Sequence, residues 1–321
     1  MLQVDKLTVH VVVDNTTDML SSRPEHVTSE LRILMGAGMK ELAGESLCSA
    51  HHGLCLAVTA HFANEVRTVL FDAGPDPYAL MRNGGHMNLD FEKIDALVLS
   101  HGHFDHSEGL LTAGKMIRSG NKERRVPLHV HPGAFVKRAV RLSDGELLPL
   151  QDVPSREALQ RAGIDLVESD KPEEIIGGSF FLTGEIPRRS FERGLPNQVR
   201  LTEAGEWEPD PLCMEERFMI ANVQGKGLAL FTGCSHAGVI NICNHARELF
   251  LDTPLYALVG GLHLVHPNED LIGATIEELK KFGFKVIIAG HCTGWRAIHS
   301  LLNAFGEEVV DPLAVGSKLS L

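Results

Sequence analysis

The feature that most constrains this chain is the loop His101-Gly102-His103-Phe104-Asp105-His106, which directly follows the apolar run 96–99. Its imidazoles and its carboxylate are donors that zinc, iron and manganese accept. A short apolar run is typical of a buried strand, and a loop at the end of such a strand is a place where a rigid scaffold can hold reactive groups. The pattern therefore predicts a metal centre at the carboxyl edge of a strand.

The spacing of the donors indicates more than one cation. In a tight turn, His101 and His103 can point onto one cation, while Asp105 and His106 reach toward a second. Two cations about 3.5–4 Å apart suit hydrolysis and phosphoryl chemistry, because one lowers the pKa of a bound water and both stabilise developing negative charge. A solvated histidine-rich loop is the alternative, and the strand before His101 argues against it.

The composition fits one large domain. The chain has 321 residues, of which 44% are hydrophobic, and no shift in composition marks a boundary, so we expect a single domain over 1–321. The net charge of −12 gives no general attraction to nucleic acid or anionic lipid, so neither is expected as a partner. No apolar run approaches the roughly 20 residues of a membrane span, and the first residues read as a strand rather than a signal peptide.

The cysteines indicate a reducing environment. They lie at positions 48, 55, 213, 234, 243 and 292, without any Cys-x-x-Cys pair. This spacing argues against a disulfide framework and against a structural zinc site, so a cytoplasmic location is expected.

Strands and helices are expected to alternate along the chain. Apolar runs bounded by turn residues predict strands at 7–13, 54–60, 66–71, 126–130, 218–223, 228–231, 255–259 and 285–289. Helical spacing predicts helices at 107–117, 133–140, 238–249 and 293–305, and one more that Asn268 is expected to cap. The segment 141–215, rich in prolines and charges, is expected to be an insertion that shapes the substrate pocket within the same domain.

Four further motifs accompany the histidine-rich loop. They are Leu70-Phe71-Asp72-Ala73-Gly74, Phe231-Thr232-Gly233-Cys234-Ser235-His236, Gly260-Gly261-Leu262-His263 and Gly290-His291-Cys292-Thr293. Together they resemble the metallo-β-lactamase superfamily, and more narrowly the branch of the archaeal dihydropterin–ribofuranosylaminobenzene phosphate synthases. The resemblance covers nearly the whole chain. It implies an α/β (α+β) fold, a four-layer αββα sandwich of two mixed sheets flanked by helices, with two metal ions between the sheets.

The resemblance also implies which residues bind metal. The implied set is His101, His103, Asp105, His106, Cys234, His236 and His291. Most members of the superfamily carry a histidine for the first metal where this chain has Glu185, so the third ligand of that metal is left open among Glu185, Cys234 and His236. Asp72 is expected to support the metal loop without ligating metal.

Two features are candidates for binding an anion. Arg188 and Arg189, with Arg193 nearby, form a basic cluster in an acidic chain and are expected to clamp a phosphate-like group of the substrate. The backbone amides at the start of the helix predicted at 238–249 are expected to favour an anion near His236.

Three other residues are candidates for contacts with a substrate. Asn15 lies in a polar turn after the first strand, from which its side chain can reach the site. His263 follows two glycines at a strand edge and is a candidate proton donor or substrate contact. Asp105 is the second catalytic candidate, because a carboxylate beside a metal can orient a water molecule.

The expected activity is that of an enzyme with two divalent metal ions, zinc first and iron or manganese as the alternatives, acting on a small anionic or phosphorylated molecule. If the branch resemblance extends to the reaction, the enzyme is a synthase (transferase) in which an aryl amine displaces diphosphate from a pterin diphosphate. Alternatively, it hydrolyses an ester, lactone or phosphodiester. A di-iron redox protein and a ligand sensor without turnover are further alternatives, and a homo-oligomer is left open.

Overall fold

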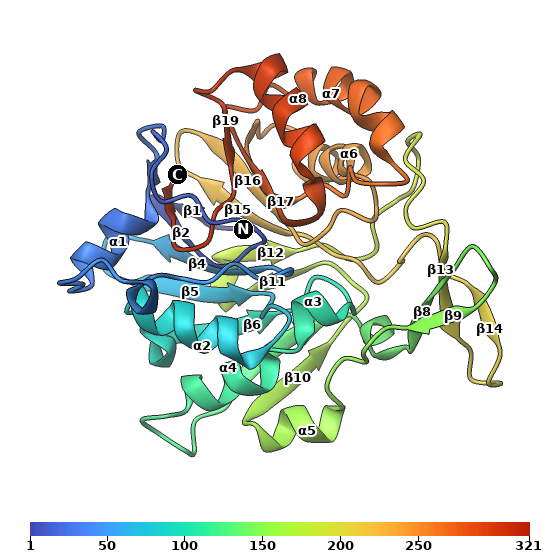
Figure 1. Cartoon of the computed structure of the whole chain (residues 1–321), viewed down its shortest axis with the longest axis horizontal. Helices are drawn as coiled ribbons and strands as arrows, with labels where there is room; N and C mark the ends of the chain where they lie inside the picture. The colour runs from blue at the N-terminus through green and yellow to red at the C-terminus, as the bar shows by residue number, and fades with distance from the viewer.

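The computed structural model describes residues 1–321 and contains two large mixed sheets that lie face to face (Figure 1). The first sheet has the order β10 (Ile164–Glu168), β7 (Val126–Val130), β6 (Ile94–Val98), β5 (Val66–Phe71), β4 (Cys55–His61), β2 (Lys6–Val13), β20 (Lys318–Ser320) and β3 (Val27–Thr28). The second has the order β11 (Glu173–Ile175), β12 (Phe180–Leu182), β15 (Met219–Val223), β16 (Gly227–Thr232), β17 (Leu255–Gly261), β18 (Val286–Gly290) and β19 (Val310–Pro312), with β1 (Gln3–Val4) beside β15. The hairpins β4–β5 and β15–β16 are antiparallel, whereas crossovers through helices make β5–β6 and β16–β17–β18 parallel.

Alternating side chains give each sheet an inner and an outer face. On β5, Val69 and Phe71 lie in the core between the sheets, whereas Leu70 points to the opposite face. Helices cover both outer faces: α1 (Glu30–Gly36), α2 (Pro77–His86), α4 (Leu110–Ile117) and α5 (Arg156–Arg161) on the first sheet, and α6 (Val239–Leu249), α7 (Ile272–Lys280) and α8 (Trp295–Phe305) on the second. The expected four-layer αββα sandwich is confirmed. None of these helices has the length and apolar character needed to cross a membrane.

The chain turns sharply at the carboxyl ends of the parallel strands. Just beyond these ends, four residues other than glycine have left-handed backbone conformations: Asp72 (φ 59°), Ser235 (φ 64°), His263 (φ 44°) and His291 (φ 49°). Such a conformation costs about 1 kcal/mol or more, so it persists only where surrounding contacts hold it, and it is enriched at functional sites. This edge of the sandwich is therefore where the fold presents its chemically active side chains.

A third sheet of four strands projects from the sandwich, at the right of Figure 1. Its order is β14 (Trp207–Pro209), β13 (Gln198–Leu201), β8 (Arg138–Arg141) and β9 (Leu147–Pro149). The helix predicted at 133–140 is wrong: only the turn η3 (Pro132–Phe135) is helical, and the residues of β8 pair with β13. Pairing with a distant strand outweighs the local preference of this segment.

The segment 141–215 is only partly an insertion. Its strands β10, β11 and β12 pair with strands of the two large sheets and belong to the sandwich itself. Only β9, β13 and β14 lie outside the sandwich, in the third sheet. The residues 195–198 at the start of β13 line the cavity described below.

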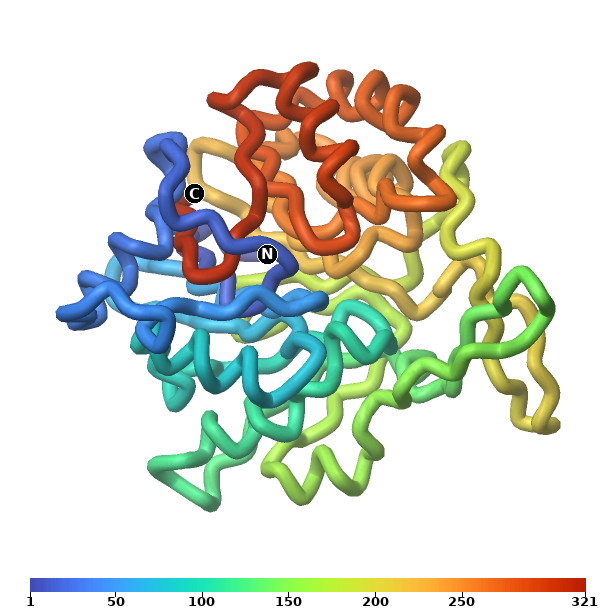
Figure 2. The backbone as a smooth tube through the Cα atoms, in the orientation of Figure 1, coloured from blue at the N-terminus to red at the C-terminus, as the bar shows by residue number.

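The C-terminal residues lie beside an N-terminal strand in the first sheet (Figure 2). The last strand, β20, pairs antiparallel with β2. The terminal Leu321 donates a backbone hydrogen bond to Leu7 (2.8 Å) and accepts one from it (3.0 Å). The last residues therefore help to complete the sheet that carries the histidine-rich loop.

The packing between the two sheets can be tested at Phe231, whose side chain is fully buried there. We expect Phe231→Ala to leave a cavity and to lower the free energy of unfolding by about 3–5 kcal/mol, measured by denaturant titration. Phe191→Ala is the matched control, since that side chain is 41% exposed and should cost less than about 1 kcal/mol. Equal losses for the two variants would contradict this core.

Candidate metal centre

The buried carboxylate of Asp72, which directly follows β5, supports the site from below. It accepts hydrogen bonds from the Ser100 amide (2.8 Å), the Ser100 hydroxyl (2.8 Å) and His106 Nδ1 (2.6 Å). Because the Ser100 hydroxyl donates to Asp72, it must accept from His101 Nδ1, 2.9 Å away. One carboxylate thus orients two imidazoles and leaves the Nε2 atom of each facing away from it, toward the other donor atoms. A β-carbon on Gly233 would lie 2.1 Å from Ser100 Oγ, so only glycine fits there.

Three imidazoles converge in what we call the first set, His101, His103 and His236. His101 Nε2 lies 3.0 Å from His103 Nδ1, and His236 Nε2 lies 3.1 and 3.2 Å from these two atoms. The His103 proton is on Nε2, because that nitrogen donates to Gln198 Oε1 at 2.7 Å. At least two of the three inward nitrogens therefore carry lone pairs that face each other. A tetrahedral zinc ion would space its nitrogen ligands about 3.3 Å apart, so the set fits a divalent cation.

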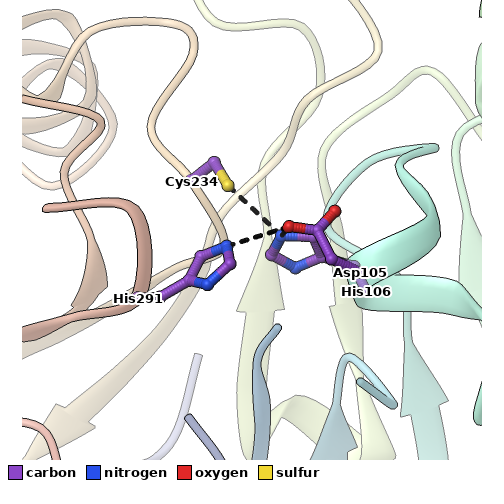
Figure 3. Close-up of side chains that lie close together, drawn as sticks. All are labelled: Asp105, His106, Cys234 and His291. Atoms are coloured by element: carbon purple, nitrogen blue, oxygen red, sulfur yellow. Dashed lines mark hydrogen bonds and ion pairs between the residues drawn. The ribbon is translucent and has the colours of Figure 1, made fainter. Parts of the chain in front are cut away.

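Figure 3 shows a second set, Asp105, His106 and His291. It lies beside the first, because the ring centroids of His101 and His106 are 4.3 Å apart. Asp105 Oδ2 is 3.3 Å from His291 Nε2 and 3.7 Å from His106 Nε2. Asp105 and His106 belong to the short helix α3 (Phe104–Ser107), whereas His291 follows β18. Residues almost two hundred positions apart in the chain therefore present an oxygen and two nitrogens to one point, as a second cation requires.

The thiol of Cys234 lies between the two sets. Its Sγ is 3.2 Å from His106 Nε2, and it lies within 4.8 Å of donor atoms in both sets. Cys234 also forms a third group with His263 and Cys292. A thiolate is a sound ligand for zinc, so the donor atoms form groups that share Cys234, and each group could hold a cation.

His291 is held by two residues of the loop after β2. The Asn15 amide donates to the His291 carbonyl (3.1 Å), and its Oδ1 accepts from His291 Nδ1 (3.2 Å). Asp14 accepts from the His291 amide at 2.9 Å, and burial raises the pKa of Asp14 to about 7. Asn15 was expected to contact substrate. The structure shows that its side chain fixes the ring of His291, with Nε2 turned toward Asp105, and that Asn15 also lines the cavity described below.

Two residues that the sequence did not single out hold the first set. Gln198 on β13 accepts from His103, and its amide nitrogen donates to the Asp210 carbonyl at 3.2 Å, which fixes the orientation of the amide. Glu216 accepts from the amides of His236 (2.8 Å) and Ala237 (2.6 Å), and burial raises its pKa to about 7. Neither residue lies in a motif, so no sequence pattern could have indicated its role.

Burial sets the charge of these groups. Burial and the neighbouring imidazoles hold the pKa values of His101 and His236 well below the usual value, and burial lowers the pKa of His103 to about 4. These rings are therefore neutral at pH 7, the state in which imidazole binds a metal. Burial also disfavours charge on Asp105 and His106. However, His106 and His291 hold the pKa of Asp105 below its usual range, and the two carboxylates Asp105 and Asp72 raise the pKa of His106 to about 9.

A cavity of about 550 Å³ opens over both sets. Asp105, His103, His236, His263 and His291 are among its lining residues, together with Asn15, Cys234 and Cys292. His263, the candidate proton donor or substrate contact, thus lies in the wall of this cavity. No lysine or arginine lines the cavity.

The expected arginine clamp is wrong, because none of the three arginines reaches this cavity. Arg188 donates to the backbone carbonyls of Ile186, Leu212 and Cys213. Arg189 pairs with Glu248 at 2.6 Å on the surface, and Arg193 pairs with Asp270. Each guanidinium contacts another part of the protein, and none of the three lines the cavity over the metal centre.

Glu185 also lies away from the two sets. Its side chain is 52% exposed, and its nearest ionic partner is His131 at 3.8 Å. Of the three residues left open as the third ligand of the first metal, His236 is the one whose imidazole faces both His101 and His103.

Two helix starts also differ from expectation. The Glu192 carboxylate accepts from the amides of Ile240 and Asn241 (3.1 Å each), so the start of α6 is already occupied by an anion of the protein itself. Asn268 does not cap α7. A helical turn, η5 (Glu269–Leu271), intervenes, and the Asn268 side chain donates to the Gly194 carbonyl at 3.1 Å.

Comparison with known proteins agrees with this geometry. A family model described as "Beta-lactamase superfamily domain" matches residues 67–154, which include Asp72 and the histidine-rich loop. A relative from Methanocaldococcus jannaschii, named 7,8-dihydropterin-6-methyl-4-(beta-D-ribofuranosyl)-aminobenzene-5'-phosphate synthase, is 30% identical over 262 residues, which are 81% of this chain and 86% of the relative. The chain belongs to the metallo-β-lactamase superfamily. The relative is the named synthase of the branch that the sequence motifs resemble, so that resemblance is confirmed.

Solved structures of the metallo-β-lactamase superfamily share the fold. A metal-dependent hydrolase of the β-lactamase superfamily has a TM-score of 0.70 and 21% identity, covering 98% of both chains. A metallo-β-lactamase fold protein from Bacillus subtilis has a TM-score of 0.53 and 14% identity, covering 99% of this chain and 100% of that one. At these identities the likeness shows the common architecture alone.

The third ligand of the first set can be tested by metal content. We expect His236→Ala to lower the metal content from two ions to one per chain in elemental analysis, because it removes one of three converging nitrogens. Glu185→Ala is the control and should retain both ions, since its side chain lies outside the site. Loss of metal in Glu185→Ala with full retention in His236→Ala would reverse this assignment.

Gln198 offers a second test, because it fixes the proton of His103 on the outer nitrogen. We expect Gln198→Leu to weaken zinc binding at the first set by about 10–100-fold, measured by competition with a chromophoric chelator. Gln151→Leu serves as control, since that side chain contacts the half-buried Glu108 and not the site. Unchanged zinc affinity in Gln198→Leu would show that the ring of His103 is held by other contacts.

Proposed function

We propose that this chain is a dinuclear metal-dependent enzyme that acts on a small anionic molecule, and that both metal ions are zinc. The observation that carries the proposal is the pair of donor sets on either side of Cys234, both facing one cavity. Nitrogen, thiol and carboxylate donors in this mixture favour zinc over calcium or magnesium. Iron and manganese remain the alternatives.

Bound cations would supply Lewis acidity at the floor of the cavity, where they stabilise negative charge on a leaving group. The chain's own groups do the rest. The backbone and side-chain contacts of Asp72, Gln198 and Asn15 hold the imidazoles in fixed tautomers, so the site is organised before substrate binds. Asp105 and His263 both line the cavity, where the Asp105 carboxylate can accept a hydrogen bond and His263 can hold a proton beside a substrate.

The walls of the cavity indicate the shape of the substrate. Above the polar floor the lining is apolar: Phe104, Val140, Leu150, Leu195, Pro196, Val265 and Pro267. Such a pocket favours a molecule with an uncharged, flat or apolar body and an anionic end that reaches the metals. The net charge of −12 argues against a nucleic-acid substrate.

The reaction we infer is the transfer catalysed by the branch of the Methanocaldococcus relative, whose name describes a dihydropterin joined to an aminobenzene. The nitrogen of an aryl amine forms a bond to the methylene carbon of a pterin diphosphate. The carbon–oxygen bond breaks, diphosphate leaves with the bonding electrons, and the amine releases one proton. The apolar walls suit the pterin ring, and the metals take the place of the arginines that were expected to bind the diphosphate.

The state of the cysteines indicates the kind of cellular compartment in which this enzyme works. All six are free and buried, and Cys234 must stay reduced to act as a ligand. We therefore infer that the protein works in a reducing compartment such as the cytoplasm.

A substrate panel tests the proposed function. We expect the zinc-loaded chain to release diphosphate from a pterin diphosphate only when an aryl amine is present, with the coupled product detected by mass spectrometry. His106→Ala should lower the rate by at least about 100-fold, because it removes a donor of the second set. Arg189→Ala should keep the full rate, since that side chain lies outside the cavity.

Two outcomes would contradict the proposal. Turnover of esters, lactones or phosphodiesters without an amine acceptor would identify a hydrolase. Full activity in the presence of a chelator that removes all metal would reject the metal-dependent class altogether.

A further inference from the structure

The side chain of Asn15 uses every hydrogen-bonding position that an amide has. Its Oδ1 accepts from the Gly53 amide (3.1 Å) and from His291 Nδ1 (3.2 Å). Its Nδ2 donates to the His291 carbonyl (3.1 Å) and lies 3.1 Å from His52 Nδ1. Two acceptor and two donor positions are thus filled, which fixes the orientation of the amide without ambiguity.

This orientation decides the tautomer of His52. Since Asn15 Nδ2 can only donate, His52 Nδ1 must accept, and the proton of the neutral ring is on Nε2. His291 has the opposite tautomer, because its Nδ1 donates to Asn15 Oδ1. One amide therefore fixes two neighbouring histidines in opposite tautomers. Nε2 of His291 carries a lone pair, whereas Nε2 of His52 carries a hydrogen that it can donate.

The donor on His52 makes no hydrogen bond within the protein. His52 lines the cavity, its side chain is 65% exposed, and its Nε2 lies 3.6 Å from Asp105 Oδ2, beyond the reach of a hydrogen bond. The ring centroid is 5.2 Å from that of His291. The N–H therefore projects into the cavity on the side of the second set.

The segment that carries His52 is held rigidly against the metal loop. The His51 amide donates to the Asp14 carbonyl (2.9 Å), and the Leu54 amide donates to the Asp105 carbonyl (3.2 Å). A β-carbon on Gly53 would lie 2.4 Å from that same carbonyl, so the backbone passes as close as glycine allows. A donor on so short and tightly held a segment is preorganised for a ligand.

The geometry points to His52 as a substrate-binding residue, whose Nε2–H donates to a phosphoryl or carboxylate oxygen of the ligand held at the second set. This inference rests on the proposed function, because it assumes an anionic ligand at the metals. In a cavity without lysine or arginine, a neutral imidazole donor can contact an oxygen that the metals do not reach. It thereby favours an oxyanion over an apolar group of similar size.

The tautomer can be measured on its own. We expect nitrogen NMR of the full chain, labelled with nitrogen-15 in histidine, to show His52 protonated at Nε2 and unprotonated at Nδ1, with the signal assigned by its loss in His52→Gln. A ring protonated at Nδ1 would overturn the inference, whatever the enzyme's reaction is.

Binding of inorganic phosphate to the zinc-loaded full chain tests the contact. We expect calorimetry to show phosphate binding about tenfold weaker in His52→Ala than in the wild type, since a hydrogen bond to a charged oxygen is lost. His52→Gln, whose amide can donate from a similar place, should restore most of the affinity. His51→Ala is the matched control and should bind phosphate like the wild type, because His51 pairs with Asp76 (2.9 Å) and does not line the cavity.

The outcomes separate the two proposals. Wild-type affinity in His52→Ala would overturn the role of His52 and leave the proposed function standing. A zinc-loaded wild-type chain that binds no phosphate would contradict the anionic substrate class itself, and the role of His52 with it.

Discussion

The contact between the Asp72 carboxylate and the histidine-rich loop is the interaction on which the rest of the site depends. A buried carboxylate is costly unless hydrogen bonds satisfy it, and Asp72 receives three, from Ser100 and His106. The Ser100 hydroxyl donates to Asp72 and accepts from His101. One residue at the end of β5 therefore orients an imidazole in each set. The left-handed backbone of Asp72 places its carboxylate beneath the loop.

The same principle operates at the other imidazoles, through amides from distant parts of the chain. Gln198 fixes His103 from the third sheet, and Asn15 fixes His291 from the loop after β2. In each case the outer nitrogen is occupied, so the inner nitrogen is left with a lone pair directed at the centre. The proposed metals would therefore be held by both large sheets and the third sheet together, which ties metal binding to the packing of the whole domain.

The positively charged side chains of this region lie outside the cavity and stabilise other parts of the protein. The arginines at 188, 189 and 193 contribute to packing and surface ion pairs, and the start of α6 is satisfied by Glu192. The cavity itself contains only imidazole, carboxylate, thiol and amide groups on its polar floor. An anionic ligand would thus be attracted by the bound cations and oriented by N–H donors, rather than neutralised by guanidinium groups.

The sequence by itself determined the central loop, most of the strands and the family, because those features are written in contiguous residues: an apolar run followed by His101 to His106, and glycine-rich turns before His263 and His291. It left Glu185, Cys234 and His236 as alternatives, read residues 133–140 as a helix, and gave no sign of Gln198, Glu216 or His52. Only the tertiary structure decided these points. A tautomer, a strand pairing or the engagement of an arginine depends on which distant group lies within about 3 Å, and chain order does not specify that distance until the sheets have packed.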